Sequence, residues 1–146
     1  MKTVYIENFK NNINYTQEGR RNIYLPLLEV KIRNAVIERF RFDGSLRIAD
    51  SAEKASLVLK GELLNYERTE LRTLENDDVQ EYRITITVSL ELFDTEKQEI
   101  AWAEPSFSGD SSYFVTGPTA KSEEQAIQDA MTDLARRIVE RTIENW

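Results

Sequence analysis

The sequence predicts an α+β fold, a two-layer α/β sandwich in which two helices pack on one face of a roughly four-stranded, mostly antiparallel sheet. Apolar and polar residues alternate along Val79–Phe93, which is typical of a strand with one buried and one solvated face. Two segments, Leu25–Arg41 and Ser122–Asn145, carry apolar residues at three- and four-residue spacing, which predicts amphipathic helices. A sheet with one apolar face needs cover on that face only, so both helices are expected there.

The strand predicted at Val79–Phe93 is the centre of this sheet. Its apolar side carries Tyr82, Ile84, Ile86, Val88, Leu90 and Leu92, and its polar side carries Arg83, Thr85, Thr87, Ser89 and Glu91. Helical winding would scatter these apolar residues around the cylinder instead of gathering them on one side. We therefore expect the polar side, including Arg83 and Thr85, to lie on the face that the helices leave exposed.

A second long strand is predicted at Leu57–Glu70, where apolar residues again alternate with polar ones. The alternation is weaker here, because Val58 and Leu64 fall on the nominally polar side. Gly61 has no side chain to pack, which indicates either a close approach by a helix or a β-bulge at this point.

Two further strands are predicted at Lys2–Glu7 and Ile100–Phe107, and Leu46–Ile48 has room only for a short strand. Pro105 lacks the N–H donor that a ladder uses, so the last strand is expected at an edge of the sheet. Within that strand, Ile100 and Trp102 are expected to face the core.

Both predicted helices have recognisable starts. Pro26 suits the first turn of a helix, where its missing N–H donor costs nothing. Ser122 and Gln125 have the spacing of a capping box, so the second helix is expected to begin there. The chain has no internal repeat, low-complexity tract or linker, and residues 1–146 are predicted to form a single domain.

Chain direction brings two polar loops together. If the two long strands form a hairpin, the tip Leu71–Asp78 lies at one end of the sheet, and the last strand returns the loop Ser108–Lys121 to the same end. Arg72 and Lys121 would then form a modest cationic spot that suits an anionic ligand.

The pair Tyr113-Phe114 in the second loop has two interpretations. Alternation along a strand does not bury both of two adjacent aromatic rings in one core. Either one ring packs beneath the end of the sheet, or the pair forms a contact surface for a partner.

Composition excludes several classes of protein. The formal net charge of -7 argues against a nucleic-acid partner, which would require a basic surface. The chain has no Cys and no His, which removes thiol nucleophiles, imidazole bases and most transition-metal sites, so no metal or cofactor is expected. No apolar run approaches the roughly 20 residues of a membrane helix, and the start MKTVYIENF has no apolar region of a signal peptide.

A carboxylate-only hydrolase is the catalytic class that remains open. Glu75, Asp77 and Asp78 form a carboxylate cluster, but the cluster lies in a polar turn and lacks the spacing of an EF-hand. Ser111 and Ser112 have no His to activate them. We therefore expect a protein that is not an enzyme.

Four stretches carry a resemblance to a known family. They are VYIENFKN, RFDGSLRIAD…AEKASLVLKGELLNYERTEL, EYRITITVSLELFD and SEEQAIQDAMTDLARRIVERTIENW. In this order they resemble the LptE family, the lipopolysaccharide-assembly lipoproteins of the bacterial outer membrane. The similarity covers nearly the whole chain.

This resemblance implies an α/β sandwich at the periplasmic face of the outer membrane, anchored by an N-terminal lipid and seated as a plug in the LptD β-barrel. Such a protein assists folding of the barrel and delivers lipopolysaccharide, and has no catalytic residues. The family's basic lipopolysaccharide contacts correspond to Arg72 and Lys121. The candidates for contact with the barrel are Arg83, Thr85, Tyr113 and Phe114. The lipid-bearing cysteine of the family is missing from this sequence.

The alternative is a periplasmic interaction domain of another envelope machine. The amino-terminal domain of TolB-like proteins and the curli-secretion proteins share a short strand followed by a helix with the predicted order of elements.

Overall fold

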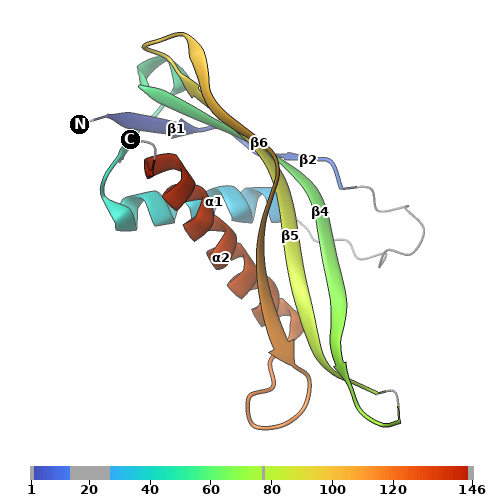
Figure 1. The fold of residues 1–146 in the computed structure, drawn as a ribbon. Helices are drawn as coiled ribbons and strands as arrows, with labels where there is room; N and C mark the ends of the chain where they lie inside the picture. Colours follow the sequence, from blue (N-terminus) through green and yellow to red (C-terminus); the bar gives the residue numbers. More distant parts are fainter. Residues whose placement is uncertain (1, 14–26, 77, 145–146) are drawn as a thin grey trace.

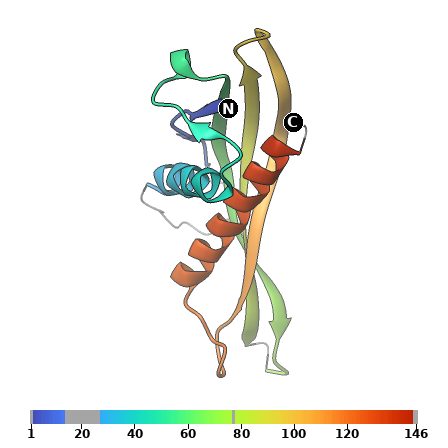
Figure 2. The ribbon, with the colours of Figure 1, turned by 90° about the vertical axis from the view of Figure 1, so that its left-hand side faces the viewer.

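The computed structural model describes residues 2–13, 27–76 and 78–144, which form two helices and a mixed sheet. The elements are β1 (Thr3–Ile6), β2 (Lys10–Asn11), α1 (Leu28–Asp43), β3 (Arg47–Ile48), the 3-10 turn η1 (Ala52–Lys54), β4 (Leu57–Thr73), β5 (Val79–Asp94), β6 (Glu99–Phe114) and α2 (Glu123–Ile143). Figures 1 and 2 show both helices on one face of the sheet and the three long strands β4, β5 and β6 extending past α1 at the end where β4 joins β5. The predicted two-layer α+β sandwich is confirmed.

The sheet has six strands in the order β3-β1-β4-β5-β6, with β2 also pairing with β4. The long strands pair antiparallel, whereas β1, β2 and β3 join the sheet in parallel. The sheet is therefore larger and more mixed than the predicted four strands. Strand β3 lies in the stretch Leu46–Ile48 for which a short strand was predicted. Strand β2 was not predicted, because its two residues are too few for an alternating pattern to reveal them.

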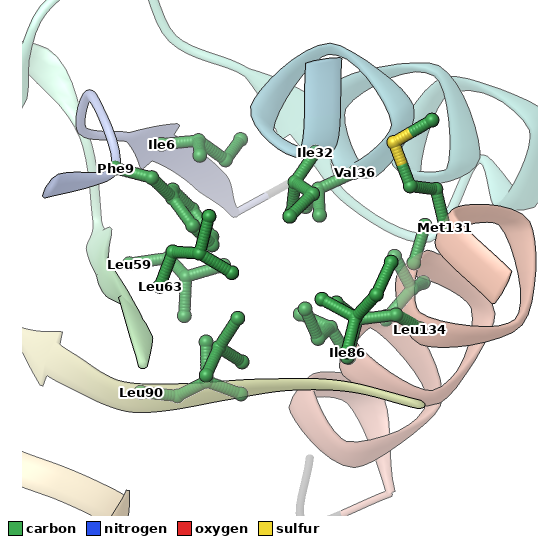
Figure 3. Close-up of a cluster of buried hydrophobic side chains, with 14 of the residues drawn as sticks. Ile6, Phe9, Ile32, Val36, Leu59, Leu63, Ile86, Leu90, Met131 and Leu134 are labelled. Carbon is green, nitrogen blue, oxygen red and sulfur yellow. The ribbon is translucent and has the colours of Figure 1, made fainter. Parts of the chain in front are cut away.

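The core lies between the helices and the inner face of the sheet. Along β5, the side chains of Ile84, Ile86, Val88, Leu90 and Leu92 are at most 3% exposed. Helix α1 adds Leu28, Ile32, Val36 and Phe40, and α2 adds a longer stripe that includes Ala130, Leu134 and Ile138. Figure 3 shows side chains from β1, β4, β5 and both helices meeting in this cluster.

Two glycines allow close approaches to the sheet. At Gly61, a Cβ atom would collide with the ring of Phe9, so a side chain from the segment before β2 fills the space in which a helix or bulge was predicted. The close helix contact occurs at Gly109, where a Cβ atom would lie 2.5 Å from Leu134 Cα. Helix α2 therefore crosses β6 at Gly109.

Strand β6 differs most from its prediction. It continues to Phe114, so the first part of the loop predicted at Ser108–Lys121 is strand, paired residue by residue with β5. A register shift next to Leu92 pairs Ile100 with Phe93, whose side chain does not face the core. Ile100 is therefore 53% exposed, and the prediction that it faces the core is wrong. The prediction that the strand with Pro105 lies at an edge is confirmed, because β6 is the last strand of the sheet.

The helix ends follow the expected chemistry. Helix α1 begins at Leu28. Its predicted start, at Leu25 and Pro26, lies outside the described residues. At its other end, Gly44 has φ +78° and donates its N–H to Phe40 O at 3.0 Å. At the start of α2, Ser122 Oγ accepts a hydrogen bond from Gln125 N at 3.1 Å, which is the N-cap half of the predicted capping box. The side chain of Gln125 donates to Asp129 Oδ1 at 3.1 Å.

Candidate ligand and partner surfaces

The end of the sheet that carries the β4–β5 turn and the segment 115–122 before α2 is called the distal end. Figures 1 and 2 show the turn and the segment at the same end of the molecule. Glu81 of β5 pairs with Arg72 on one side and with Phe114 on the other, and the N–H of Lys121 donates to Phe114 O at 2.9 Å. The structure therefore brings Arg72 and Lys121 to the same end, as chain direction indicated.

The two cations lie on different sides of the sheet. Arg72 shares a cross-strand row with Glu81, on the face opposite the helices, and its Nε lies 3.1 Å from Glu81 Oε1. Lys121 lies at the start of α2, and its Nζ contacts Asp129 Oδ2 at 3.0 Å. The side chains of Arg72 and Lys121 are 67% and 48% exposed, and each has further N–H donors for a second anion.

Asp129 lies next to Lys121 and is held in its charged form. The hydrogen bond from Lys121 lowers the pKa of the Asp129 carboxyl, and one from Gln125 lowers it further; together they outweigh a smaller upward effect of burial. A ligand anion at Lys121 would therefore share the ammonium group with an ionised carboxylate.

Apolar side chains accompany the cations at the distal end. Leu71, Leu74 and Val115 are exposed although they are large and hydrophobic. The sequence offered a signal for two of them, because Leu71 and Leu74 interrupt an otherwise polar tip. The distal end thus presents positive charge and apolar surface together.

The face of the sheet away from the helices is called the outer face. It carries Thr69, Arg83, Thr85, Thr87, Ser89, Ser108, Asp110 and Ser112 on the three long strands. Arg83 aligns with Thr69 and Ser112, and the hydroxyls of Thr87 and Ser108 lie 2.9 Å apart. Neither helix packs on this face in the part of the chain that the structure describes (Figure 2). Its side chains are mostly polar, and the long charged side chains of Glu67, Glu81 and Arg83 lie among the short hydroxyl groups.

The pair Tyr113-Phe114 divides between the two faces. Tyr113 is 4% exposed and stacks on Tyr82 with ring centroids 5.7 Å apart. Its prediction as a partner contact is therefore wrong, because β6 continues through it and turns its ring to the core. Phe114 lies on the outer face beside Glu81 and is half-buried, so it stays a candidate for contact.

A polar cluster holds the first turn of α2 against the distal end. The Arg68 guanidinium lies 3.9 Å from the Tyr82 ring centroid and 3.3 Å from Glu123, which also accepts a hydrogen bond from the hydroxyl of Tyr66. Burial lowers the pKa of Arg68, but a hydrogen bond with Tyr113 and the nearby negative charge outweigh this effect and raise it overall. The sequence carried no signal for this cluster, since Arg68 and Glu123 lie 55 positions apart.

The described residues contain no group of three carboxylates that could hold a metal ion. Asp94 is the buried carboxylate of β5, and it accepts hydrogen bonds from the backbone N–H groups of Glu96 and Lys97 at 3.0 and 3.1 Å. Its role is to close the β5–β6 turn. None of the helices within the described ranges is sufficiently long and apolar to cross a membrane.

Solved structures share the fold at low sequence identity. A protein from Xanthomonas campestris matches with a TM-score of 0.70 and 12% identity, covering 97% of this chain and 83% of that chain. An uncharacterized lipoprotein B from Nitrosomonas europaea matches with a TM-score of 0.60 and 14% identity, covering 97% and 81%. The rare lipoprotein B from Shewanella oneidensis matches with a TM-score of 0.55 and 20% identity, covering 97% and 95%. These likenesses show the fold alone.

A search of curated proteins gives no match. A family model described as "LptE: Lipopolysaccharide-assembly" matches residues 1–142, almost the full length. The chain therefore belongs to the LptE family of lipopolysaccharide-assembly proteins.

Proposed function

We propose that this protein is a non-catalytic component of outer-membrane lipopolysaccharide assembly. In this role it plugs an LptD-type β-barrel, assists folding of the barrel and contacts lipopolysaccharide. The observation that carries the proposal is the outer face, a broad surface on three long strands that no described helix covers.

The outer face has the chemistry expected of a surface that contacts a barrel wall. The interior of a large barrel is polar, and short hydroxyl side chains such as Thr85 and Thr87 adapt to either donors or acceptors. Arg83 and Phe114 add a charge and an aromatic ring near the distal end, and both residue types are enriched where proteins meet. We assign Arg83, Thr85 and Phe114 to contact with the barrel.

The distal end has the chemistry that lipopolysaccharide requires. Lipopolysaccharide is a phosphorylated amphiphile, and Arg72 and Lys121 both offer N–H donors to phosphate. Leu71, Leu74 and Val115 offer apolar surface to its acyl chains. We therefore assign lipopolysaccharide contact to this end, with Arg72 and Lys121 as the phosphate contacts.

The proposed location is the periplasmic face of the outer membrane, where a lipid at the N-terminus would anchor the protein. This location agrees with the membership in a lipopolysaccharide-assembly family. Mass spectrometry of the protein recovered from its native membrane would detect the lipid.

Co-expression with an LptD-type barrel tests the proposed partnership. An affinity tag on this chain should recover the barrel in a stable complex, in detergent and at moderate salt. A known LptD–LptE pair provides the positive control, and absence of the barrel where the known pair is recovered would contradict the proposal.

A charge-reversal pair tests the lipopolysaccharide contact. Arg72→Asp combined with Lys121→Asp should weaken lipopolysaccharide binding by at least about tenfold, since each lost charged hydrogen bond contributes about 1.5–3 kcal/mol. Lys31→Asp combined with Lys54→Asp is the matched control, because it changes net charge equally at exposed sites on α1 and η1. If both double variants lose binding equally, the loss reflects net charge and not a contact at Arg72 and Lys121. If the Arg72→Asp, Lys121→Asp variant binds as the parent does, the proposed contact is excluded.

A further inference from the structure

The two cations of the distal end are paired with carboxylates that differ in exposure. Arg72 Nε lies 3.1 Å from Glu81 Oε1, and the Glu81 side chain is only 12% exposed. Lys121 Nζ lies 3.0 Å from Asp129 Oδ2, and the Asp129 side chain is 36% exposed. A mostly buried carboxylate that loses its cation stays uncompensated, whereas a more exposed one regains water. Arg72 is therefore held by its partner more firmly than Lys121 is.

Asp129 has a second donor that does not depend on Lys121. Gln125 Nε2 donates to Asp129 Oδ1 at 3.1 Å, while Lys121 contacts the other carboxylate oxygen. Gln125 and Asp129 both lie on α2, one turn apart, so the helix keeps them together. If Lys121 leaves, Asp129 keeps the hydrogen bond from the amide and its other oxygen is solvated. The ion pair of Lys121 can therefore open without leaving the carboxylate unpaired.

The backbone at Lys121 is fixed, so a change of partner requires movement of the side chain alone. The N–H of Lys121 donates to Phe114 O at 2.9 Å, and the next residue, Ser122, caps α2. The ammonium group lies at the end of a flexible four-carbon stem, and the side chain is exposed. Lys121 can therefore turn from Asp129 to a ligand while the helix and the strand stay in place.

Given the lipopolysaccharide contact proposed above, we propose that Lys121 passes from Asp129 to a phosphate of the ligand, while Arg72 stays paired with Glu81. Asp129 is then an internal competitor that sets how tightly Lys121 holds the phosphate. Gln125 keeps Asp129 hydrogen-bonded while Lys121 is engaged with the ligand. Because the carboxylate stays ready to take the ammonium group back, the contact is weakened and the phosphate is released more easily.

The affinity for purified lipopolysaccharide tests this exchange, because Asp129 and Lys121 should have opposite effects. Asp129→Asn keeps the shape of the side chain and removes the competing charge. It should raise the affinity by about two- to fivefold, the range that corresponds to loss of an exposed ion pair. Lys121→Met should lower the affinity by about tenfold, since it removes a charged hydrogen bond to phosphate.

A double variant shows whether Asp129 acts through Lys121. In the Lys121→Met background, Asp129→Asn should leave the affinity unchanged, because the competition has no object. Gln125→Ala should lower the affinity below that of the parent, because Asp129 then depends on Lys121 more strongly. An affinity of Gln125→Ala at or above that of the parent would contradict the part assigned to Gln125.

Asp50→Asn is the matched control. It makes the same change of charge at an exposed site that follows β3, at the end of the sheet opposite the distal end, and it should bind as the parent does. No gain in affinity for Asp129→Asn, an equal gain for Asp50→Asn, or the same gain in the Lys121→Met background would each overturn the exchange. If Lys121→Met itself binds as the parent does, the lipopolysaccharide contact at Lys121 fails together with the exchange.

Discussion

The two faces of β5 carry neighbouring residues under opposite constraints. Ile84, Ile86 and Val88 are completely buried against the helices, whereas Arg83 and Thr85 lie on the outer face. The buried residues are fixed by packing, because the close-packed core has little room for another shape. The outer residues have no such constraint within the chain. The residues of the outer face can therefore be selected for contact with a partner. Substitutions on the two faces test this difference, because they should affect stability differently.

The largest effect on stability is expected on the covered face. Ile86→Ala should lower the free energy of unfolding by about 2–5 kcal/mol, because it leaves a cavity between β5 and α2. Thr85→Val, one residue away on the outer face, keeps the shape of the side chain and should change stability by no more than about 0.5 kcal/mol. Urea denaturation measures both, and similar losses in the two variants would remove the contrast between the faces.

The crossing of α2 over β6 is the next most sensitive point. Gly109→Ala places a methyl group against the backbone of Leu134, so the helix must shift, at a cost of about 1–3 kcal/mol. Ser112→Ala, an exposed position on the outer face of the same strand, is the control and should have little effect. A Gly109→Ala protein as stable as the parent would show that α2 is packed more loosely than described.

A smaller, pH-dependent effect is expected where α2 meets the edge of the sheet. Asp133 accepts the N–H of Asp110 at 2.9 Å and pairs with Arg136 and Arg137 at 2.8 and 3.0 Å. Burial raises the pKa of Asp133, but these hydrogen bonds and charges outweigh it and lower the pKa overall. The resulting stabilisation is complete above the ordinary carboxyl pKa of about 4 and is lost as the pH falls through the lowered pKa.

Thermal unfolding measured between about pH 6 and about pH 2 should therefore decline less steeply for Asp133→Asn than for the parent protein. The difference is expected to stay below about 1 kcal/mol, because the ion pairs are partly exposed. Parallel pH curves for the two proteins would show that Asp133 contributes nothing through its charge.

The sequence predicted those elements in which an alternating or helical pattern of apolar residues extends over many positions. The alternation along Val79–Phe93 gave the inner face of β5, and the capping pattern at Ser122 gave the start of α2. The short strand β2 was missed because two residues have no period, whereas β3 lies in the stretch Leu46–Ile48 for which a short strand was predicted. The continuation of β6 to Phe114 was missed because Gly109 and the polar residues around it look like a loop, although β5 provides the pairing partner that extends the strand.

The candidate surfaces could be predicted only in part. Chain direction correctly placed Arg72 and Lys121 at one end, but not on opposite sides of the sheet. The burial of Tyr113 depends on the exact end of β6, which local sequence did not define. The cluster of Arg68 with Glu123 depends on a contact between elements far apart in the chain, for which a single sequence carries no pattern.

The central claim, that the outer face contacts the barrel, is tested most directly by recovery of the barrel with two matched variants. Thr85→Arg places a long charged side chain on the outer face, and Thr132→Arg places the same group at an exposed position of α2. Both proteins should fold with unfolding free energies close to that of the parent. We expect Thr85→Arg to lose the co-purified LptD-type barrel while Thr132→Arg retains it. Retention of the barrel by a folded Thr85→Arg protein would contradict the claim.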